Sequence, residues 1–309
     1  MTRSLLRDDD LSPAEQAEVL ALAARLKAHP YDDKPLAGPR TVAMVFDKPT
    51  LRTQASFAAG IAELGGHPML VDGTLAGIGK RESVADVARV LGRQASQIVW
   101  RTYAQTDLDE MAAMAGVPVI NGLTDEFHPC QLLADLLTIS AHKGHVAGLS
   151  VAFLGDAACN MGNSWALAGV IAGMHVRFGC PEGYAPDSAV LARASGLATG
   201  GSVAVTTDPV AAVESVDVVV TDTWVSMGKE DEATTRRATF SPYAVTADLV
   251  AHAKPDAIVM HCLPAYRGSE IAAEVIDGPQ SVVWDEAENR RHAQKAVMAW
   301  LQARAGDAV

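Results

Sequence analysis

Cysteine is scarce in this sequence and never occurs in a paired pattern. The four cysteines lie far apart along the chain, at Cys130, Cys159, Cys180 and Cys262. Zinc ribbons and redox motifs need Cys-x-x-Cys pairs, and disulfide-stapled proteins are rich in cysteine. Neither adjacent His261 and Cys262 nor His142 with His145 has the usual spacing of metal ligands. We therefore expect reduced thiols and no metal.

Long apolar runs are also missing. No stretch approaches the roughly 20 apolar residues that a membrane-spanning helix needs. Asp8, Asp9 and Asp10 follow soon after Met1, which is unlike a secretory signal. The sequence therefore predicts a cytoplasmic protein without a membrane partner.

Positive charge is in deficit, with 25 Lys and Arg against 37 Asp and Glu and a formal net charge of −12. This balance argues against non-specific binding of nucleic acid, although a local basic pocket can still hold a small anion. Apolar residues, in contrast, are plentiful. They make up 49% of the 309 residues, enough for two compact domains that each bury a core.

Strand-like apolar runs alternate with helical periodicity along the chain. A first series covers residues 41–46, 67–71, 97–101 and 117–121, and a second covers 150–154, 175–178, 202–206, 217–221, 257–260 and 281–284. The helical runs between them predict two parallel-sheet α/β domains. Helices are also expected over residues 12–28, where Ser12 and Glu15 form a capping box, and over 285–304. A helix over 130–142 would join the domains, with the boundary near residues 143–148.

The turn after the first expected strand has the composition of an anion site. Pro49 disfavours helix at the residue before it, so Thr50 is a natural N-cap for a helix over residues 51–65. Free N–H groups, the hydroxyls of Thr50 and Thr53 and the guanidinium of Arg52 would form a phosphate cradle at the positive end of that helix. An ordinary capped helix with a surface arginine fits the same spacing.

Two nucleotide-binding motifs fail when their spacing is checked. The Gly-Lys pair at residues 79–80 has Thr74 where a phosphate-binding loop needs Gly and Arg81 where it needs Ser or Thr. We therefore interpret residues 73–81 as a mobile loop. After the expected strand 150–154, Ala157 replaces the second glycine of a dinucleotide fingerprint, which argues against NAD binding at this turn.

Further polar groups follow expected strands or stand at expected helix starts. They are His128 with Gln131, Asn160, Asp222 with Ser226-Met227-Gly228, the run His261-Cys262-Leu263-Pro264, and Arg290. Ligands of parallel α/β proteins bind at the carboxyl ends of strands, and a helix start attracts anions. Taken singly, each group is more often explained by capping, packing or a solvated loop.

Taken together and in this order, these residues resemble the aspartate/ornithine transcarbamylase family. The resemblance runs from the Thr50 turn through Arg101 to Arg290 and covers nearly the whole chain. It implies two parallel α/β domains assembled into homotrimers, with the last helix returning to the first domain. Residues 1–143, with 285–309, would bind carbamoyl phosphate, and residues 144–284 would bind the amino acid.

The activity implied by the resemblance is attack of the side-chain amine of L-ornithine on the carbamoyl carbon. L-citrulline and phosphate would form without a cofactor, as a step of arginine biosynthesis. The implied carbamoyl phosphate ligands are Thr50, Leu51, Arg52, Thr53, Arg101, His128, Gln131, Cys262, Leu263 and Arg290. The implied ornithine ligands are Asn160, Asp222, Ser226 and Met227. The residues expected to take part in catalysis are Arg52, Arg101, His128, Asp222 and Cys262.

Two positions depart from the family pattern. The usual Ser-x-Arg-Thr-Arg motif ends here in Gln54, and Gly77 stands where relatives often have a Gln that reaches the phosphate of an adjacent subunit. Relatives specific for aspartate do not share the Asp222, Ser-Met-Gly and His-Cys-Leu-Pro combination, which favours ornithine. Carbamoylation of putrescine or another amine, and a non-catalytic binding protein with this fold, are the alternatives.

Overall fold

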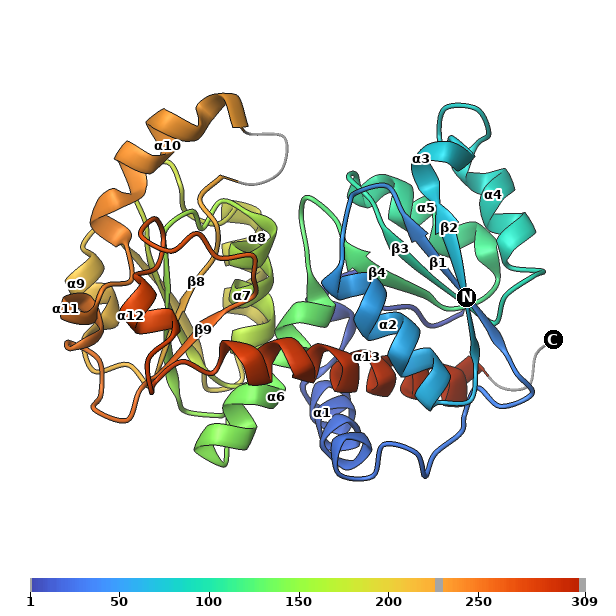
Figure 1. Ribbon diagram of the computed structural model, residues 1–309, viewed down its shortest axis with the longest axis horizontal. Coiled ribbons are helices and arrows are strands. Elements are labelled where there is room, and N and C mark those ends of the chain that lie inside the picture. Colours follow the sequence, from blue (N-terminus) through green and yellow to red (C-terminus); the bar gives the residue numbers. More distant parts are fainter. Residues whose placement is uncertain (1, 226–229, 306–309) are drawn as a thin grey trace. The chain divides into compact units, whose positions relative to one another are not determined.

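A computed structural model describes residues 2–225 and 230–305 (Figure 1). The chain divides into two compact units. The first unit comprises Met1–Leu137 and Glu288–Val309, and the second unit comprises Thr138–Ala287. Both divisions fall inside a helix, α6 (Pro129–Lys143) and α13 (Val283–Ala305), so these two helices connect the units covalently.

The first unit contains a four-stranded parallel sheet in the order β2-β1-β3-β4. Its strands are β1 (Thr41–Phe46), β2 (His67–Asp72), β3 (Gln97–Arg101) and β4 (Val119–Leu123). The other elements of this unit are η1 (Asp8–Asp10), α1 (Pro13–Ala28), α2 (Arg52–Glu63), α3 (Gly73–Ala76), α4 (Val84–Leu91) and α5 (Gln105–Ala115). Each strand begins and ends within two residues of the range predicted from the sequence.

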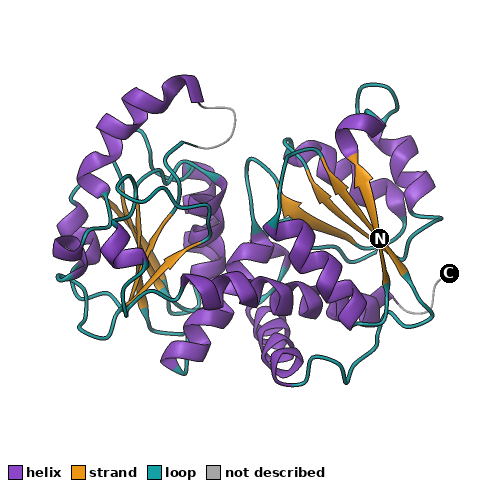
Figure 2. Ribbon diagram, in the orientation of Figure 1, coloured by secondary structure: helices purple, strands orange, loops and turns teal. Residues whose placement is uncertain are grey.

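Both faces of this sheet are buried, because alternate side chains of a strand point to opposite faces. Val42 and Met44 of β1 belong to the apolar cluster that includes α1, α2, α6 and α13. Ala43 and Val45 belong to a second cluster, with Trp100 of β3 and residues of α4 and α5. Figure 2 shows helices on both faces of the sheet. This two-sided burial explains why β1 reads as a continuous apolar run in the sequence.

The last helix returns to the first unit, as the resemblance implied. Val297 and Leu301 of α13 share an apolar cluster with Phe57 of α2. Lys295, with a fully buried side chain, pairs with Glu63 of α2 at 2.7 Å. α13, drawn in red in Figure 1, therefore contributes to the core of a unit whose other elements all precede residue 138.

The second unit contains a five-stranded parallel sheet in the order β7-β6-β5-β8-β9. Its strands are β5 (Ser150–Leu154), β6 (His175–Gly179), β7 (Ser202–Thr206), β8 (Val218–Thr221) and β9 (Ile258–His261). Its other elements are α7 (Asn160–Ile171), α8 (Ser188–Leu197), α9 (Pro209–Val213), η2 (Glu230–Glu232), α10 (Ala233–Phe240), η3 (Ser241–Tyr243), α11 (Ala247–Val250) and α12 (Ala273–Ile276). The predicted fold class, two parallel-sheet α/β domains, is confirmed.

The strand predicted over residues 281–284 is wrong. Ser281 forms only an isolated bridge with Val259, and α13 begins at Val283. The Val-Val-Trp run has β propensity, but Asp285 and Glu286 follow it in the first turn of α13, where negative charge stabilises a helix start. Val283 is buried in the core of the second unit as part of that helix.

One smaller expectation needs adjustment. The loop predicted over residues 73–81 begins with the short helix α3, because the side chain of Asp72 accepts a hydrogen bond from the N–H of Leu75 at 2.9 Å and caps it. The capping box of Ser12 and Glu15 at the start of α1 is confirmed. Within the described ranges 2–225 and 230–305, no helix is both long and apolar enough to cross a membrane.

Candidate active site

Side chains from two helices and one strand meet at a single hydroxyl in the first unit, and a third helix adds a further contact. Thr53 Oγ1 of α2 accepts a 2.8 Å hydrogen bond from Arg290 of α13 and a 3.3 Å bond from Arg101 at the end of β3. Arg290 also donates to the side-chain oxygen of Gln131 in α6, whose amide donates to Asp135 at 2.8 Å. None of these five side chains belongs to a residue more than 9% exposed. The arrangement holds two guanidinium groups in a buried, cationic cluster.

The sheet explains why these residues meet. Val99 packs on the face covered by α2, α6 and α13, and Arg101, two residues later in β3, has the same parity. Thr53 and Gln131 lie in the first turns of their helices. In a parallel sheet, the helix that follows a strand starts at the carboxyl edge. Arg101, Thr53 and Gln131 therefore share one edge of the sheet.

His128 directly precedes α6 and is 3% exposed. Its carbonyl accepts a 3.0 Å hydrogen bond from the N–H of Gln131, which fixes the residue at the helix start. Burial first, and then the positive charges of Arg290, Arg101 and Arg52, lower the pKa of the imidazole well below its usual 6.5. The ring is neutral at physiological pH, and a neutral imidazole can donate one hydrogen bond to a substrate without adding a charge.

The turn before α2 provides the expected helix start. α2 begins at Arg52, and Leu51 before it already has helical dihedral angles, φ −94° and ψ −55°. The Thr50 hydroxyl accepts a 3.4 Å hydrogen bond from the N–H of Thr53, as an N-cap residue does. Leu51 is 79% exposed. Amide groups, a hydroxyl and the Arg52 guanidinium thus occur together at the positive end of α2.

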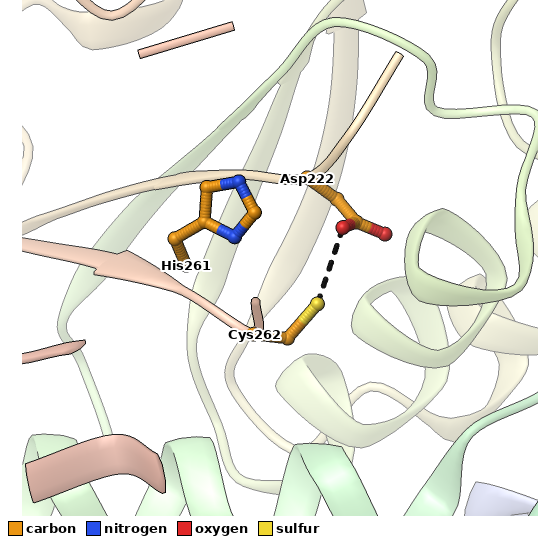
Figure 3. Close-up of side chains that lie close together, drawn as sticks. All are labelled: Asp222, His261 and Cys262. Carbon is orange, nitrogen blue, oxygen red and sulfur yellow. Dashed lines mark hydrogen bonds between the residues drawn. The ribbon is translucent and has the colours of Figure 1, made fainter. Parts of the chain in front are cut away.

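In the second unit, neighbouring strands carry a carboxylate and a thiol at their carboxyl ends. Asp222 follows β8 and Cys262 follows β9, and these strands pair in the sheet. The thiol of Cys262 donates to Asp222 Oδ1 at 3.2 Å, and Figure 3 shows the sulfur pointing toward the carboxylate. Burial raises the pKa of Asp222 above its usual 3.8, although a 2.7 Å hydrogen bond from the N–H of Thr223 lowers it.

His261 lies beside this pair (Figure 3). Both nitrogens of its ring have neighbours within the protein. Nδ1 accepts a 2.9 Å hydrogen bond from the N–H of Leu263, and Nε2 lies 3.2 Å from Oε1 of the buried Glu270. Ligand-type atoms of Asp222, His261 and Cys262 lie within 4.8 Å of one another. Because both ring nitrogens already hold neighbours, this donor set fits a metal ion poorly. The ring instead fixes the backbone at Leu263.

The start of α7 lies close to Asp222. Burial first, and then the charge of Asp222, raises the pKa of the thiol of Cys159, the residue before Asn160. The turn into α7 needs glycine at position 162, since a Cβ there would lie 2.0 Å from the carbonyl oxygen of Ala157. Asn160, the first residue of α7, therefore starts its helix at the strand edge that carries Asp222.

Two residues expected in the site, Ser226 and Met227, lie outside the described residues. Two acidic residues that hold expected site residues were missed. Asp135 is four residues after Gln131 on α6, a helical spacing from which the contact could have been found. Glu270 lies nine residues after His261 in a segment without regular secondary structure, where no local sequence pattern predicts the contact.

The fold and these clusters define a class of protein: a two-unit parallel α/β protein whose polar clusters follow the carboxyl ends of its strands. Two family models match the chain. Residues 3–141 match the carbamoyl-P binding domain of aspartate/ornithine carbamoyltransferase, and residues 147–301 match its Asp/Orn binding domain. The chain belongs to the aspartate/ornithine carbamoyltransferase family.

Individual relatives are similar over their whole length. An ornithine carbamoyltransferase of Clavibacter michiganensis subsp. michiganensis is 61% identical over 303 residues, which cover 97% of this chain and 99% of the relative. One of Renibacterium salmoninarum is 60% identical over 307 residues, with coverage of 97% and 99%. The structure of ornithine carbamoyltransferase from Pyrococcus furiosus has a TM-score of 0.92 at 45% identity and covers 96% of each chain.

Proposed function

We propose that this protein transfers the carbamoyl group of carbamoyl phosphate to the side-chain amine of L-ornithine, giving L-citrulline and phosphate. The observation that carries the proposal is the buried cluster in which Thr53, Gln131 and two arginines meet, in a chain of this family. The reaction is a step of arginine biosynthesis. Residues 1–143 with 285–309 bind carbamoyl phosphate, and residues 144–284 bind ornithine.

The phosphate of the donor binds at the start of α2. The hydroxyls of Thr50 and Thr53, the Leu51 amide and the guanidinium groups of Arg52 and Arg101 are the ligands. A helix start and two cations suit a dianion because they provide directed N–H donors as well as opposite charge. Arg101 already contacts Thr53, so its position is set before the substrate arrives.

The carbonyl oxygen of the carbamoyl group gains negative charge when the amine attacks. Arg101, Arg290 and His128 donate to this oxygen, and the Thr53 hydroxyl helps to hold the two arginines. Donors that are fixed in advance stabilise such charge strongly, because they do not reorganise during the reaction. Gln131 and the Cys262-Leu263 segment bind the carbamoyl amide.

Ornithine binds at the strand ends of the second unit. Asn160, Ser226 and Met227 hold its α-amino and carboxylate groups, and Asp222 with Cys262 lies at the reacting amine. The amine nitrogen forms a bond to the carbamoyl carbon, the bond from that carbon to the phosphate oxygen breaks, and the amine loses a proton. The raised pKa of Asp222 makes its carboxylate a stronger acceptor for that proton than an exposed aspartate would be.

The assembled form is a homotrimer in the cytoplasm, as the resemblance implies. The trimer would place loops of one subunit near the site of the next. Sedimentation velocity at assay concentration tests this assembly. A fully active monomer would contradict it.

The test of the activity is a citrulline assay with carbamoyl phosphate and ornithine, run beside putrescine and aspartate. Ornithine should be used far better than putrescine, which lacks the carboxylate that Asn160 would help to bind. Asp222→Asn should abolish most of the turnover. Asp277→Asn is the matched control, since Asp277 is an exposed carboxylate of the same unit that pairs with Arg267. Absence of citrulline in the parent, or equal use of putrescine, would overturn the proposal.

A further inference from the structure

Asp47, the residue after β1, holds the end of β3 from the face opposite to Arg101. Its Oδ2 accepts a 2.8 Å hydrogen bond from the indole N–H of Trp100, and its carboxylate also accepts one from the side chain of Thr102. Its backbone N–H donates to the carbonyl of Arg101 at 2.9 Å. Asp47 thus contacts three consecutive residues, with Arg101 in the middle.

The opposite side of β3 is irregular at this point. Pairing with β4 shifts register between Trp100 and Arg101, so that Trp100 faces Asn121 whereas Arg101 faces Leu123. Gly122 is passed over in this pairing, and a Cβ on it would lie 3.3 Å from the Cβ of Arg101. Such an irregularity changes the direction of a side chain and loosens the ladder around it. The β4 side therefore constrains Arg101 less than a regular ladder would.

A third observation concerns the space around the carboxylate. A Cβ on Gly73 would lie 1.9 Å from Asp47 Oδ1, so the first residue of α3 must be glycine for the carboxylate to keep its place. Trp100 and Thr102 are each no more than 3% exposed, so their donors need a partner within the protein. Gly73, Trp100 and Thr102 thus accommodate the Asp47 carboxylate, and none of these three residues is predicted to bind substrate.

We propose that Asp47 is a positioning residue for Arg101. It aims the Arg101 guanidinium by fixing Trp100 and Thr102, the residues on either side of it. Arg101 is one of the donors to phosphate and carbonyl oxygen in the proposed function, so this inference rests on that function for its chemical consequence. Removing the Asp47 carboxylate leaves every substrate ligand in the chain but lets Arg101 adopt other orientations.

The test compares inorganic phosphate affinity, measured by titration calorimetry, and steady-state kinetics in matched variants. Asp47→Asn offers one neutral acceptor oxygen in place of a two-oxygen carboxylate, which weakens the hydrogen bonds to Trp100 and Thr102. It should weaken phosphate binding about tenfold, the equivalent of roughly one hydrogen bond. The KM for ornithine should change by less than about twofold. Asp72→Asn is the control. Asp72 neighbours Gly73 but accepts from Leu75, and the phosphate affinity of this variant should equal that of the parent.

A double-mutant comparison separates positioning from a general structural effect. In an Arg101→Ala background, Asp47→Asn should cause no further loss of phosphate affinity, because the residue through which it acts is gone. If Asp47→Asn fails to fold, Trp100→Phe removes one of the two hydrogen bonds and should give a smaller loss that also vanishes in the Arg101→Ala background. An equal loss in both backgrounds, or an unchanged affinity in the single variant, would overturn the inference. The phosphate affinities test the role of Asp47 even if the parent forms no citrulline. Absence of citrulline would count against the proposed function only.

Discussion

Replacing Thr53 with valine tests whether one hydroxyl organises the cationic cluster. Thr53→Val keeps the shape of a side chain that is 1% exposed, but it removes the acceptor of the bonds from Arg290 at 2.8 Å and from Arg101 at 3.3 Å. A hydrogen bond to a charged group contributes about 1.5–3 kcal/mol. We assign about 2 kcal/mol to the shorter bond and about 1 to the longer one, because a hydrogen bond weakens with distance. The loss of about 3 kcal/mol predicts a fall of roughly a hundredfold in kcat/KM for carbamoyl phosphate.

The assay is citrulline formation with ornithine saturating, with circular dichroism and thermal melting as checks on the fold. Thr53→Ser restores the hydroxyl and should recover most of the activity. A Thr53→Val enzyme within about threefold of the parent, with its fold intact, would refute the reasoning, because both guanidinium groups would then be placed correctly without the hydroxyl.

Four further predictions concern the residues and substrates of the same site. Arg52→Ala should leave the fold intact and lower kcat by roughly a hundredfold, since a fixed donor to developing charge contributes about 3 kcal/mol; kinetics with a melting curve check this. In the parent, kcat/KM for ornithine should rise from pH 7 to pH 9, because the amine has a pKa of about 10.4 and reacts in its neutral form. Protonation of Asp222, whose pKa is raised by burial, should add an acid limb to that pH profile, and the limb should be missing from the residual activity of Asp222→Asn. Because the pKa of His128 is lowered in the folded state, the unfolded chain binds a proton below about pH 6.5 that the folded chain does not bind. The free energy of unfolding, measured by urea titration, should therefore rise with pH up to about 6.5. This rise should be smaller in His128→Gln.

Local sequence patterns predicted an element well where its residues are buried on both faces or where capping residues mark its start. β1 and β3 are short apolar runs buried on both faces, and Ser12 with Glu15 places the start of α1. The failure at residues 281–284 has a physical cause. The run there has β propensity, but the negative charges that follow it and the packing of Val283 stabilise a helix instead. Propensity is a weak guide where a helix start and a core contact compete with it.

The candidate site was predictable as a set of positions but not as a set of contacts. Asp222 and Cys262 could be named because each follows an expected strand, and their hydrogen bond follows from the pairing of β8 with β9. The hydrogen bond between Thr53 and Arg290 joins residues that lie 237 positions apart in the sequence, and no local sequence pattern predicts such a contact. Asp47 was missed for the same reason, since its partner Trp100 lies 53 residues away. The ligand and catalytic roles of all the predicted site residues stay predictions, and Ser226 and Met227 lie outside the described residues.

The return of α13 to the first unit has a consequence for biosynthesis of the chain. The second unit is continuous, Thr138–Ala287, and can fold as soon as its last residue leaves the ribosome. The first unit is made first but is completed last, because its core includes Val297 and Leu301 and its cationic cluster includes Arg290. Until those residues emerge, the part of this core that α13 covers remains exposed to chaperones or to aggregation. A protein stopped before α13 would therefore expose part of its core and would also lack Arg290 of the cationic cluster.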